Sequence, residues 1–266
     1  MTLLGTCASA GKETSAATYD PLAPHYDAYR KAPDYPRWLA GLLDLAAEHG
    51  LNGGLALDVG CGTGTSTEAL IAAGFEASGV DPSPAMLDRA RARLGDDVQL
   101  GVSALPEPLP VGPEVDLVTA FNDVLNYVEP ESLGAAVTSL AGRMRSGGLL
   151  LFDANTPLLY TTYCVAPAVS ETEDVFFVFQ PLTDPGEPTQ RSDLHAFVRD
   201  PHDPTVWERT VSHHVQHLHT HDAMVAALED AGLELIDVRG AFNEGPLGGA
   251  PDETQHIKRV YLARLP

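Results

Sequence analysis

An apolar segment that ends in a glycine-rich turn is the strongest constraint on how this chain can fold. Residues 55–59 are apolar except for Asp58, and they are followed by three alternate glycines: Gly60, Gly62 and Gly64. The segment predicts a buried parallel strand, and glycine allows the positive φ angles and close ligand approach that a tight turn needs. A helix over residues 65–73 and a second strand over residues 77–80 are expected next. The stretch therefore predicts a nucleoside-binding βαβ unit.

The acid after the second predicted strand narrows the kind of nucleoside. Asp81 follows residues 77–80 directly, at a position where a carboxylate can accept hydrogen bonds from two ribose hydroxyls. A dinucleotide-binding turn has the spacing G-x-G-x-x-G, in which the third glycine packs the helix against the strand. That glycine would stand at position 65, which is Thr65. The spacing therefore disfavours a nicotinamide dinucleotide and favours a single ribose.

The run LALDVGCGTG at residues 55–64, followed by Asp81, resembles the first two motifs of class I S-adenosylmethionine (SAM) dependent methyltransferases. The resemblance implies an α/β fold with a Rossmann-like, doubly wound sheet, and SAM as the methyl donor. It also implies that the glycine loop passes the methionine part of SAM and that Asp81 holds the ribose. The alternative is an arbitrary tight strand–helix turn that binds nothing.

The resemblance also supplies candidate cofactor-binding residues around the loop and the second strand: Asp58, Gly60, Cys61, Gly62, Gly64, Asp81, Pro82 and Met86. Met86 is a candidate apolar wall for the adenine, although a methionine here equally fits helix–sheet packing. Many relatives carry an acid for the adenine amino group after the third strand, which is expected at residues 98–102. This chain lacks that acid, so backbone groups near Ser103 and Ala104 are expected to hold the adenine.

The segment YDPLAPHYDAY at residues 19–29 is rich in aromatic side chains. Similar segments at the start of small-molecule methyltransferases fold over the cofactor, which makes Tyr19 and Tyr26 candidates for binding the methionine carboxylate. An aromatic face packed on the core is the other interpretation, and both stay open. Residues 1–17 are small and polar and are expected to form a disordered leader.

Polar side chains follow the fourth predicted strand, at residues 115–121. Ligands in a doubly wound sheet lie at the carboxyl ends of the strands, so these side chains are expected at the site. Asn122 is a candidate for cofactor binding, and Asp123 and Tyr127 are candidate catalytic residues that handle the nucleophile. A capped strand–helix loop without such a role is the structural alternative.

Residues 156–218 interrupt the alternation of helices and strands with β-rich runs separated by Pro, Gly and Asp. They predict a small antiparallel sheet inserted into the SAM-binding domain, which would comprise residues 18–155 and 219–266. In the methyltransferases that this chain resembles, such an insertion forms a lid and supplies substrate specificity.

A row of histidines closes the insertion: His213, His214, His217, His219 and His221. On a strand, His213, His217, His219 and His221 would share one face. The row can be a polar outer face, a general base or a metal site, in that order of preference. No HExxH motif or cysteine pair accompanies it, so no metal is expected. His217, in mid-strand, is the candidate base.

Charge and hydropathy limit which partners and which cellular location are expected for this protein. The formal net charge of −21 disfavours nucleic acid and anionic membrane surfaces. No apolar run approaches the roughly 18 residues that a membrane span needs, and the first residues lack a signal-peptide pattern. A soluble, cytoplasmic protein is therefore expected, with a homodimer as a possibility that the sequence leaves open.

Together these features predict an enzyme that transfers a methyl group from SAM to nitrogen or oxygen of a small molecule. The expected acceptor is a specialised metabolite, of the kind met in antibiotic biosynthesis. Two alternatives stay open: a SAM-binding protein that catalyses another reaction, such as a cyclisation, and a non-enzymatic interaction module. Degenerate glycines or a lost ribose acid would mark the interaction module, and this chain has neither.

Overall fold

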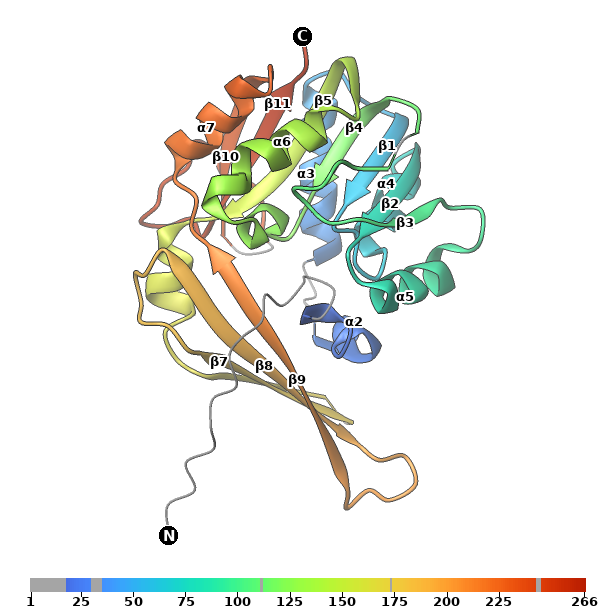
Figure 1. Cartoon of the computed structure of the whole chain (residues 1–266), viewed down its shortest axis with the longest axis vertical. Coiled ribbons are helices and arrows are strands. Elements are labelled where there is room, and N and C mark those ends of the chain that lie inside the picture. The colour runs from blue at the N-terminus through green and yellow to red at the C-terminus, as the bar shows by residue number, and fades with distance from the viewer. Residues whose placement is uncertain (1–17, 30–34, 111, 173, 243–244) are drawn as a thin grey trace.

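The computed structural model describes residues 18–29, 35–110, 112–172, 174–242 and 245–266, so the leader predicted at residues 1–17 lies outside the described part. Two sheets organise the chain: a seven-stranded sheet of order β10-β11-β5-β4-β1-β2-β3 and a four-stranded sheet of order β6-β7-β8-β9. Helices cover the larger sheet, and the smaller sheet extends away from it (Figure 1). The predicted fold, a Rossmann-like sheet with a small antiparallel sheet, is confirmed.

The larger sheet is parallel in its centre and antiparallel at one edge. Its strands are β1 (Gly54–Val59), β2 (Phe75–Asp81), β3 (Leu100–Val102), β4 (Val115–Ala120), β5 (Met144–Asn155), β10 (Glu234–Ala241) and β11 (Lys258–Arg264). β1 pairs in parallel with both β2 and β4, whereas β11 pairs antiparallel with β5 and β10. The strand order reverses between β1 and β4, and a ligand crevice opens at the carboxyl ends of strands at such a reversal.

Both faces of the larger sheet are covered, which explains the continuous apolar run of β5. Along β5, Leu149 and Leu151 pack toward helix α3 (Tyr35–Glu48), while Leu150 and Phe152 face α6 (Leu133–Ala141) and α7 (His221–Asp230). Successive side chains of a strand point to opposite faces, so a strand buried on both sides is apolar throughout. The remaining helices of eight or more described residues are α4 (Thr65–Ala72) and α5 (Pro84–Leu94).

The boundary between α6 and β5 differs from the sequence-based prediction. The sequence of residues 133–144 predicts a helix that stops at residues 146–148, but the helix ends at Ala141, and Met144 already pairs with Val115. The pairing shifts register just after Val115, and Gly147 has a φ of 81°. Gly147 and Gly148 therefore form an irregularity inside β5, where a tight bend needs residues without a Cβ.

The smaller sheet is formed by β6 (Ala168–Glu171), β7 (Val175–Pro181), β8 (Thr189–Arg199) and β9 (Trp207–His217), all antiparallel. One of its faces buries Phe177 and Leu194 against Leu22 and the aromatic rings of the segment that includes η1 (Ala23–His25) and α2 (Tyr26–Tyr29). The aromatic segment therefore fills the space between the smaller sheet and the rest of the molecule. β6 was not predicted from the sequence.

The expected common strand face for the histidine row is wrong for its last two members. β9 ends at His217, His219 lies in the loop that follows, and His221 begins α7. Thr220 is the N-cap of α7, and its side chain accepts a hydrogen bond from the backbone N–H of Ala223. Because Thr220 starts a helix, the strand that the histidine spacing suggested cannot continue to His221.

Candidate active site

The three glycines of the loop after β1 share a positive φ angle but differ in what a side chain at each position would meet. Gly60, Gly62 and Gly64 have φ angles of 73°, 54° and 86°, in the region that side chains rarely adopt. A Cβ on Gly60 would lie 2.4 Å from Cγ2 of Val124, and one on Gly64 would lie 2.9 Å from Cδ1 of Leu94. A Cβ on Gly62 would meet nothing within 4 Å, because this residue faces an open cavity.

The carboxylate of Asp81 lies at the centre of the turn. It accepts the backbone N–H of Gly62 at 2.8 Å and that of Ser83 at 2.9 Å. Burial raises the pKa of Asp81 to about 6, although both N–H groups oppose the shift. The acid is therefore ionised near neutral pH and has oxygen lone pairs left for a ligand.

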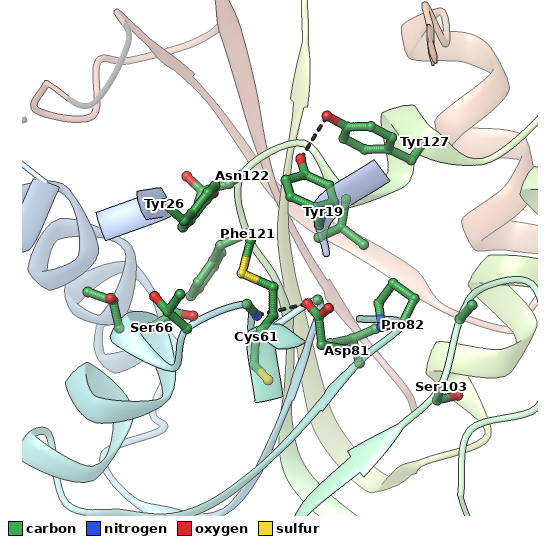
Figure 2. Close-up of a pocket in the computed structure, with 18 of the residues that line it drawn as sticks. Tyr19, Tyr26, Cys61, Ser66, Asp81, Pro82, Ser103, Phe121, Asn122 and Tyr127 are labelled. Carbon is green, nitrogen blue, oxygen red and sulfur yellow. Dashed lines mark hydrogen bonds between the residues drawn. The ribbon is translucent and has the colours of Figure 1, made fainter. Parts of the chain in front are cut away.

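A cavity of about 320 Å³ opens over this loop at the reversal point of the sheet (Figure 2). It is lined by most of the predicted cofactor residues: Tyr19, Tyr26, Gly60, Cys61, Gly62, Asp81, Pro82, Met86, Ser103, Ala104 and Asn122. Tyr127, predicted as catalytic, lines it as well. Its size falls in the range of small-molecule and cofactor sites.

Asp58 and Gly64 are not among the residues that line this cavity. The buried Asp58 carboxylate accepts hydrogen bonds from the hydroxyls of Ser66, Thr67 and Thr119. We therefore revise its predicted role from cofactor contact to support, because it joins the start of α4 to β4. Gly64 is the N-cap of α4 and packs close to Ala90 and Leu94.

The aromatic segment crosses the cavity and is tied to both loops that flank it. Asp27 accepts the Thr63 hydroxyl at 2.6 Å and forms an ion pair with Arg93 at 2.7 Å. Asp20 accepts the Ser83 hydroxyl at 2.5 Å. The segment therefore lies over the cavity, and two carboxylates that the sequence analysis did not single out hold it in place.

A second cavity, of about 150 Å³, lies next to the first and beneath the smaller sheet. The two cavities share four residues: Tyr19, Tyr26, Asn122 and Tyr127. The second cavity is also lined by Asp123 and, from β9, by His214 and Gln216. A ligand in the first cavity would therefore be directly adjacent to one in the second.

Two phenols and an imidazole are joined at the boundary of the cavities. The Tyr19 hydroxyl donates to the Tyr127 hydroxyl at 2.8 Å, and the Tyr127 oxygen lies 2.9 Å from Nδ1 of His214. Burial raises the pKa of both tyrosines well above the usual value and lowers the pKa of His214 to about 4. All three side chains are therefore neutral at physiological pH.

His217, the predicted base, lines neither of the two cavities. Its ring lies between Glu129, at 3.2 Å, and the Thr189 hydroxyl, also at 3.2 Å, while its backbone oxygen accepts from Asn126. Successive strand residues alternate between faces, so His214 rather than His217 reaches the cavity. Within the described part of the chain, no group of three or more His, Cys, Asp or Glu side chains is arranged to hold a metal ion.

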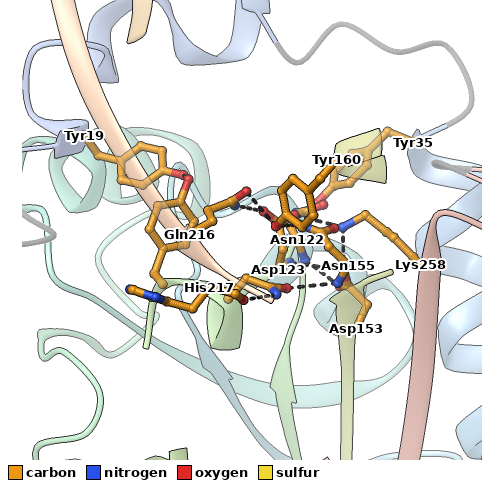
Figure 3. Close-up of polar contacts among 12 residues, drawn as sticks. Tyr19, Tyr35, Asn122, Asp123, Asp153, Asn155, Tyr160, Gln216, His217 and Lys258 are labelled. Atoms are coloured by element: carbon orange, nitrogen blue, oxygen red, sulfur yellow. Dashed lines mark hydrogen bonds and ion pairs between the residues drawn. The ribbon is translucent and has the colours of Figure 1, made fainter. Parts of the chain in front are cut away.

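A buried ion-pair cluster supports the turn after β4 (Figure 3). Lys258 Nζ lies 2.8 Å from Asp123 and 2.5 Å from Asp153, and Gln216 donates a hydrogen bond to Asp123. The sequence analysis missed both Lys258 and Asp153 as site residues. A lysine at the start of a closing strand whose centre, residues 260–263, is apolar was the available signal, because lysine is rarely buried without an ionic partner.

The sheet is doubly wound, and the glycine loop and an acid suited to binding ribose lie where its strand order reverses. These features are typical of Rossmann-like enzymes that bind a nucleoside cofactor. Residues 56–148 match a family model described as a methyltransferase domain. A putative methyltransferase of Geobacillus sp. (strain WCH70) is 29% identical over 253 residues, covering 92% of this chain and 98% of the relative.

Two solved structures have the same fold. A SAM-dependent methyltransferase from Clostridium acetobutylicum ATCC 824 matches with a TM-score of 0.77 and 20% identity, over 93% of this chain and 98% of the other. The sugar N-methyltransferase KedS8 from Streptoalloteichus sp. ATCC 53650 matches with a TM-score of 0.71 and 20% identity, over 99% of both chains. The methyltransferase domain, the relative that spans nearly the whole chain and the shared fold together support a class I SAM-dependent methyltransferase, with SAM as the methyl donor. Among the described residues, no helix is both long and apolar enough to cross a membrane.

Proposed function

We propose that this enzyme transfers the methyl group of SAM to an amine or hydroxyl of a small molecule held in the cavity beneath the smaller sheet. The observation that carries the proposal is the common wall of the two cavities, formed in part by Tyr19, Asn122 and Tyr127. Methyl transfer from a sulfonium is an in-line displacement, and it needs a donor and an acceptor in adjoining, oriented sites. Orientation alone can account for a large part of the rate acceleration.

In this proposal the first cavity holds SAM. The backbone of the glycine loop passes the methionine part, Asp81 accepts the two ribose hydroxyls, and Met86 packs against the adenine. Ser103 and Ala104 line the same cavity, and in this proposal they contact the adenine in place of the missing acid. The aromatic segment, which Asp20 and Asp27 hold over the cavity, excludes water from the sulfonium once SAM is bound.

We further propose that the acceptor is an amine, with an amino sugar as the first candidate. Two observations support this choice. The formal net charge of −21 favours the approach of a cationic ammonium over that of an anion, and the structurally similar KedS8 is a sugar N-methyltransferase. A hydroxyl acceptor uses the same cavity and is the alternative within this proposal.

The first test is calorimetry with S-adenosylhomocysteine, comparing the native chain with Asp81→Asn. We expect binding to the native chain and a loss of roughly 10-fold or more in affinity for the variant, because two hydrogen bonds to a charged acceptor are weakened. Asp237→Asn is the matched control, since Asp237 is a carboxylate on β10 that pairs with His49 and Arg239. Equal affinity in Asp81→Asn would contradict the ribose assignment.

The second test is methyl transfer to matched acceptors, followed by mass spectrometry. A methyl 3-amino-3-deoxyhexoside and the corresponding methyl hexoside differ only in the candidate nucleophile. We expect the amino sugar to gain a methyl group faster than the hydroxyl sugar. Tight S-adenosylhomocysteine binding without methylation of an amine or a hydroxyl acceptor would favour a non-methylating reaction.

A further inference from the structure

We propose that His214, on the smaller sheet, is a positioning residue that sets the direction of the Tyr19–Tyr127 hydrogen bonds, so that the Tyr19 oxygen accepts a hydrogen bond from the nucleophile. This inference rests on the proposed methyl transfer and deepens it. It assigns a chemical role to a side chain of the inserted sheet, and it requires an acceptor that carries an N–H or O–H group.

The contacts form one continuous chain. Tyr19 Oη lies 2.8 Å from Tyr127 Oη, which lies 2.9 Å from Nδ1 of His214, and Nε2 of the same ring lies 2.9 Å from Oγ of Ser212. The Tyr19 and His214 rings also pack edge to face, with centroids 5.3 Å apart. The chain therefore runs from the boundary of the two cavities into the smaller sheet.

The Tyr19–Tyr127 hydrogen bond is compatible with a His214 ring that accepts at Nδ1. Tyr19 donates to Tyr127, so the single hydroxyl hydrogen of Tyr127 is available for Nδ1 of His214. Burial lowers the pKa of His214 to about 4, which keeps the ring neutral, with one hydrogen. If Nδ1 accepts, that hydrogen is on Nε2, where it donates to Ser212.

The consequence for a ligand is that the Tyr19 oxygen presents a lone pair and no hydrogen. An amine with an N–H bond can donate to this oxygen and keep its own lone pair directed toward the methyl group. A phenol whose hydrogen were free would instead donate to the amine lone pair and compete with the attack. His214 prevents this competition by keeping both phenol hydrogens engaged.

The hydrogen bond to Tyr19 also strengthens as the reaction proceeds. The amine reacts in its neutral form, so an acceptor that arrives as an ammonium releases one proton to solvent before the step. The amine lone pair then forms the new N–C bond, the C–S bond breaks, its electron pair stays on sulfur, and the positive charge passes from sulfur to nitrogen. The N–H bonds become more acidic in the transition state, so a fixed acceptor lone pair stabilises the transition state more than the bound substrate. Donation by Tyr19 to Tyr127, and by Tyr127 to His214, makes the Tyr19 oxygen a better acceptor.

The charged groups around His214 are compatible with a neutral ring. Asp123, on the turn after β4, and Asp193, on β8, favour the protonated ring, whereas burial and the neighbouring His213 oppose it. The charge of Asp123 is shared with Lys258, and Asp193 is 2.6 Å from Nδ1 of His213. Both carboxylates therefore have a close ion-pair partner of their own.

The first arm of the test needs no acceptor. Histidine-selective ¹⁵N NMR of the full chain, with the resonance assigned through His214→Gln, reports which ring nitrogen carries the hydrogen. We expect the neutral Nε2–H form at pH 7 and a change of the Nδ1 shift in Tyr127→Phe. A Nδ1–H form, or a protonated ring at pH 7, would overturn the inference.

The second arm measures single-turnover methylation of the methyl 3-amino-3-deoxyhexoside. For Tyr127→Phe and His214→Leu we expect the rate to fall roughly 10- to 100-fold, while S-adenosylhomocysteine affinity stays within about threefold, because the lost interaction acts in the transition state. His214→Gln keeps an acceptor oxygen and is expected to recover part of the rate. His213→Gln is the matched control, since this neighbouring ring is exposed and pairs with Asp193.

These outcomes separate the two proposals. Native enzyme that binds S-adenosylhomocysteine but methylates neither sugar contradicts the proposed function, and the NMR arm still decides the hydrogen-bond direction. Native enzyme that methylates the amino sugar, with Tyr127→Phe and His214→Leu within threefold of its rate, overturns the role of His214 alone.

Discussion

Lys258 Nζ lies 2.5 Å from the carboxylate of Asp153, and the side chains are only 8% and 0% exposed. Asp153 in turn accepts the backbone N–H groups of Asn122 and Asp123, at 2.6 and 3.1 Å. These two residues have φ angles of 61° and 57°, which is uncommon for residues other than glycine. A lysine on the antiparallel edge of the sheet thereby supports a strained turn at the boundary of both cavities.

Burial by itself would lower the pKa of Lys258, but Asp123 and Asp153 together raise it above the usual value. The lysine is therefore charged at neutral pH. Burial raises the pKa of Asp153, and Lys258 opposes that shift. The charged states of Lys258, Asp123 and Asp153 depend on one another, and the loss of one leaves a buried charge without compensation.

We expect Lys258→Met to lower the free energy of unfolding by roughly 3–5 kcal/mol, the usual cost of breaking a buried ion pair. Urea unfolding followed by circular dichroism measures it. Arg239→Met is the control, because Arg239 also bridges two carboxylates but lies at the surface, where such pairs contribute about 1 kcal/mol or less. Similar losses in the two variants would contradict this account of the buried cluster.

Cofactor affinity is expected to depend on pH through Asp81, whose pKa is raised by burial to about 6. The ionised carboxylate can accept two ribose hydroxyls, whereas the protonated form has lost one acceptor position. Affinity for S-adenosylhomocysteine should therefore be constant above pH 7 and fall by up to about tenfold per unit below pH 6. Calorimetry between pH 5 and 8 measures this dependence, and Asp81→Asn should make the profile flat. A native profile that is already flat would exclude Asp81 as the titrating contact.

Glycine substitutions should distinguish crowding from backbone strain in the loop. Gly60→Ala places a Cβ 2.4 Å from Val124 Cγ2, whereas Gly62→Ala meets nothing within 4 Å. Both variants carry the cost of a positive φ, about 1–2 kcal/mol, and only Gly60→Ala adds a clash. Unfolding free energies should fall more for Gly60→Ala, and Val124→Ala in the same chain should recover part of the difference. Equal losses, with no recovery, would show that the clash has no effect.

The cover over the first cavity should control cofactor release. Asp27→Asn weakens the contacts to Thr63 and Arg93, so the segment should open more often. We expect S-adenosylhomocysteine to dissociate roughly 5- to 10-fold faster in stopped-flow fluorescence. Arg91→Ala removes an exposed ion pair on the same helix, α5, and should leave the rate unchanged. An unchanged rate in Asp27→Asn would mean that release does not require this segment to open.

Sequence reasoning placed the elements of the larger sheet well, because both faces of its strands are buried and its turns carry distinctive residues. For example, Ser83 followed by Pro84 favours a helix start from the sequence alone, and α5 begins there in the structure. The sequence-based prediction was wrong where a tertiary contact overrides a local signal. Gly147 looked like a helix stop, but pairing of Met144 with Val115 extends the strand through it.

The sequence by itself predicted the tight glycine turn and the carboxylate at the end of the second strand, since glycine spacing and a strand-end acid are local features with a direct physical meaning. Only the tertiary structure decided which histidine reaches the cavity, because strand faces are defined by pairing, and β9 places Ser192 opposite His214. It also decided that Lys258 supports the active-site turn. Antiparallel pairing sets Lys258 opposite Asn155 and Val260 opposite Asp153, which brings together charges 105 positions apart that no local pattern connects.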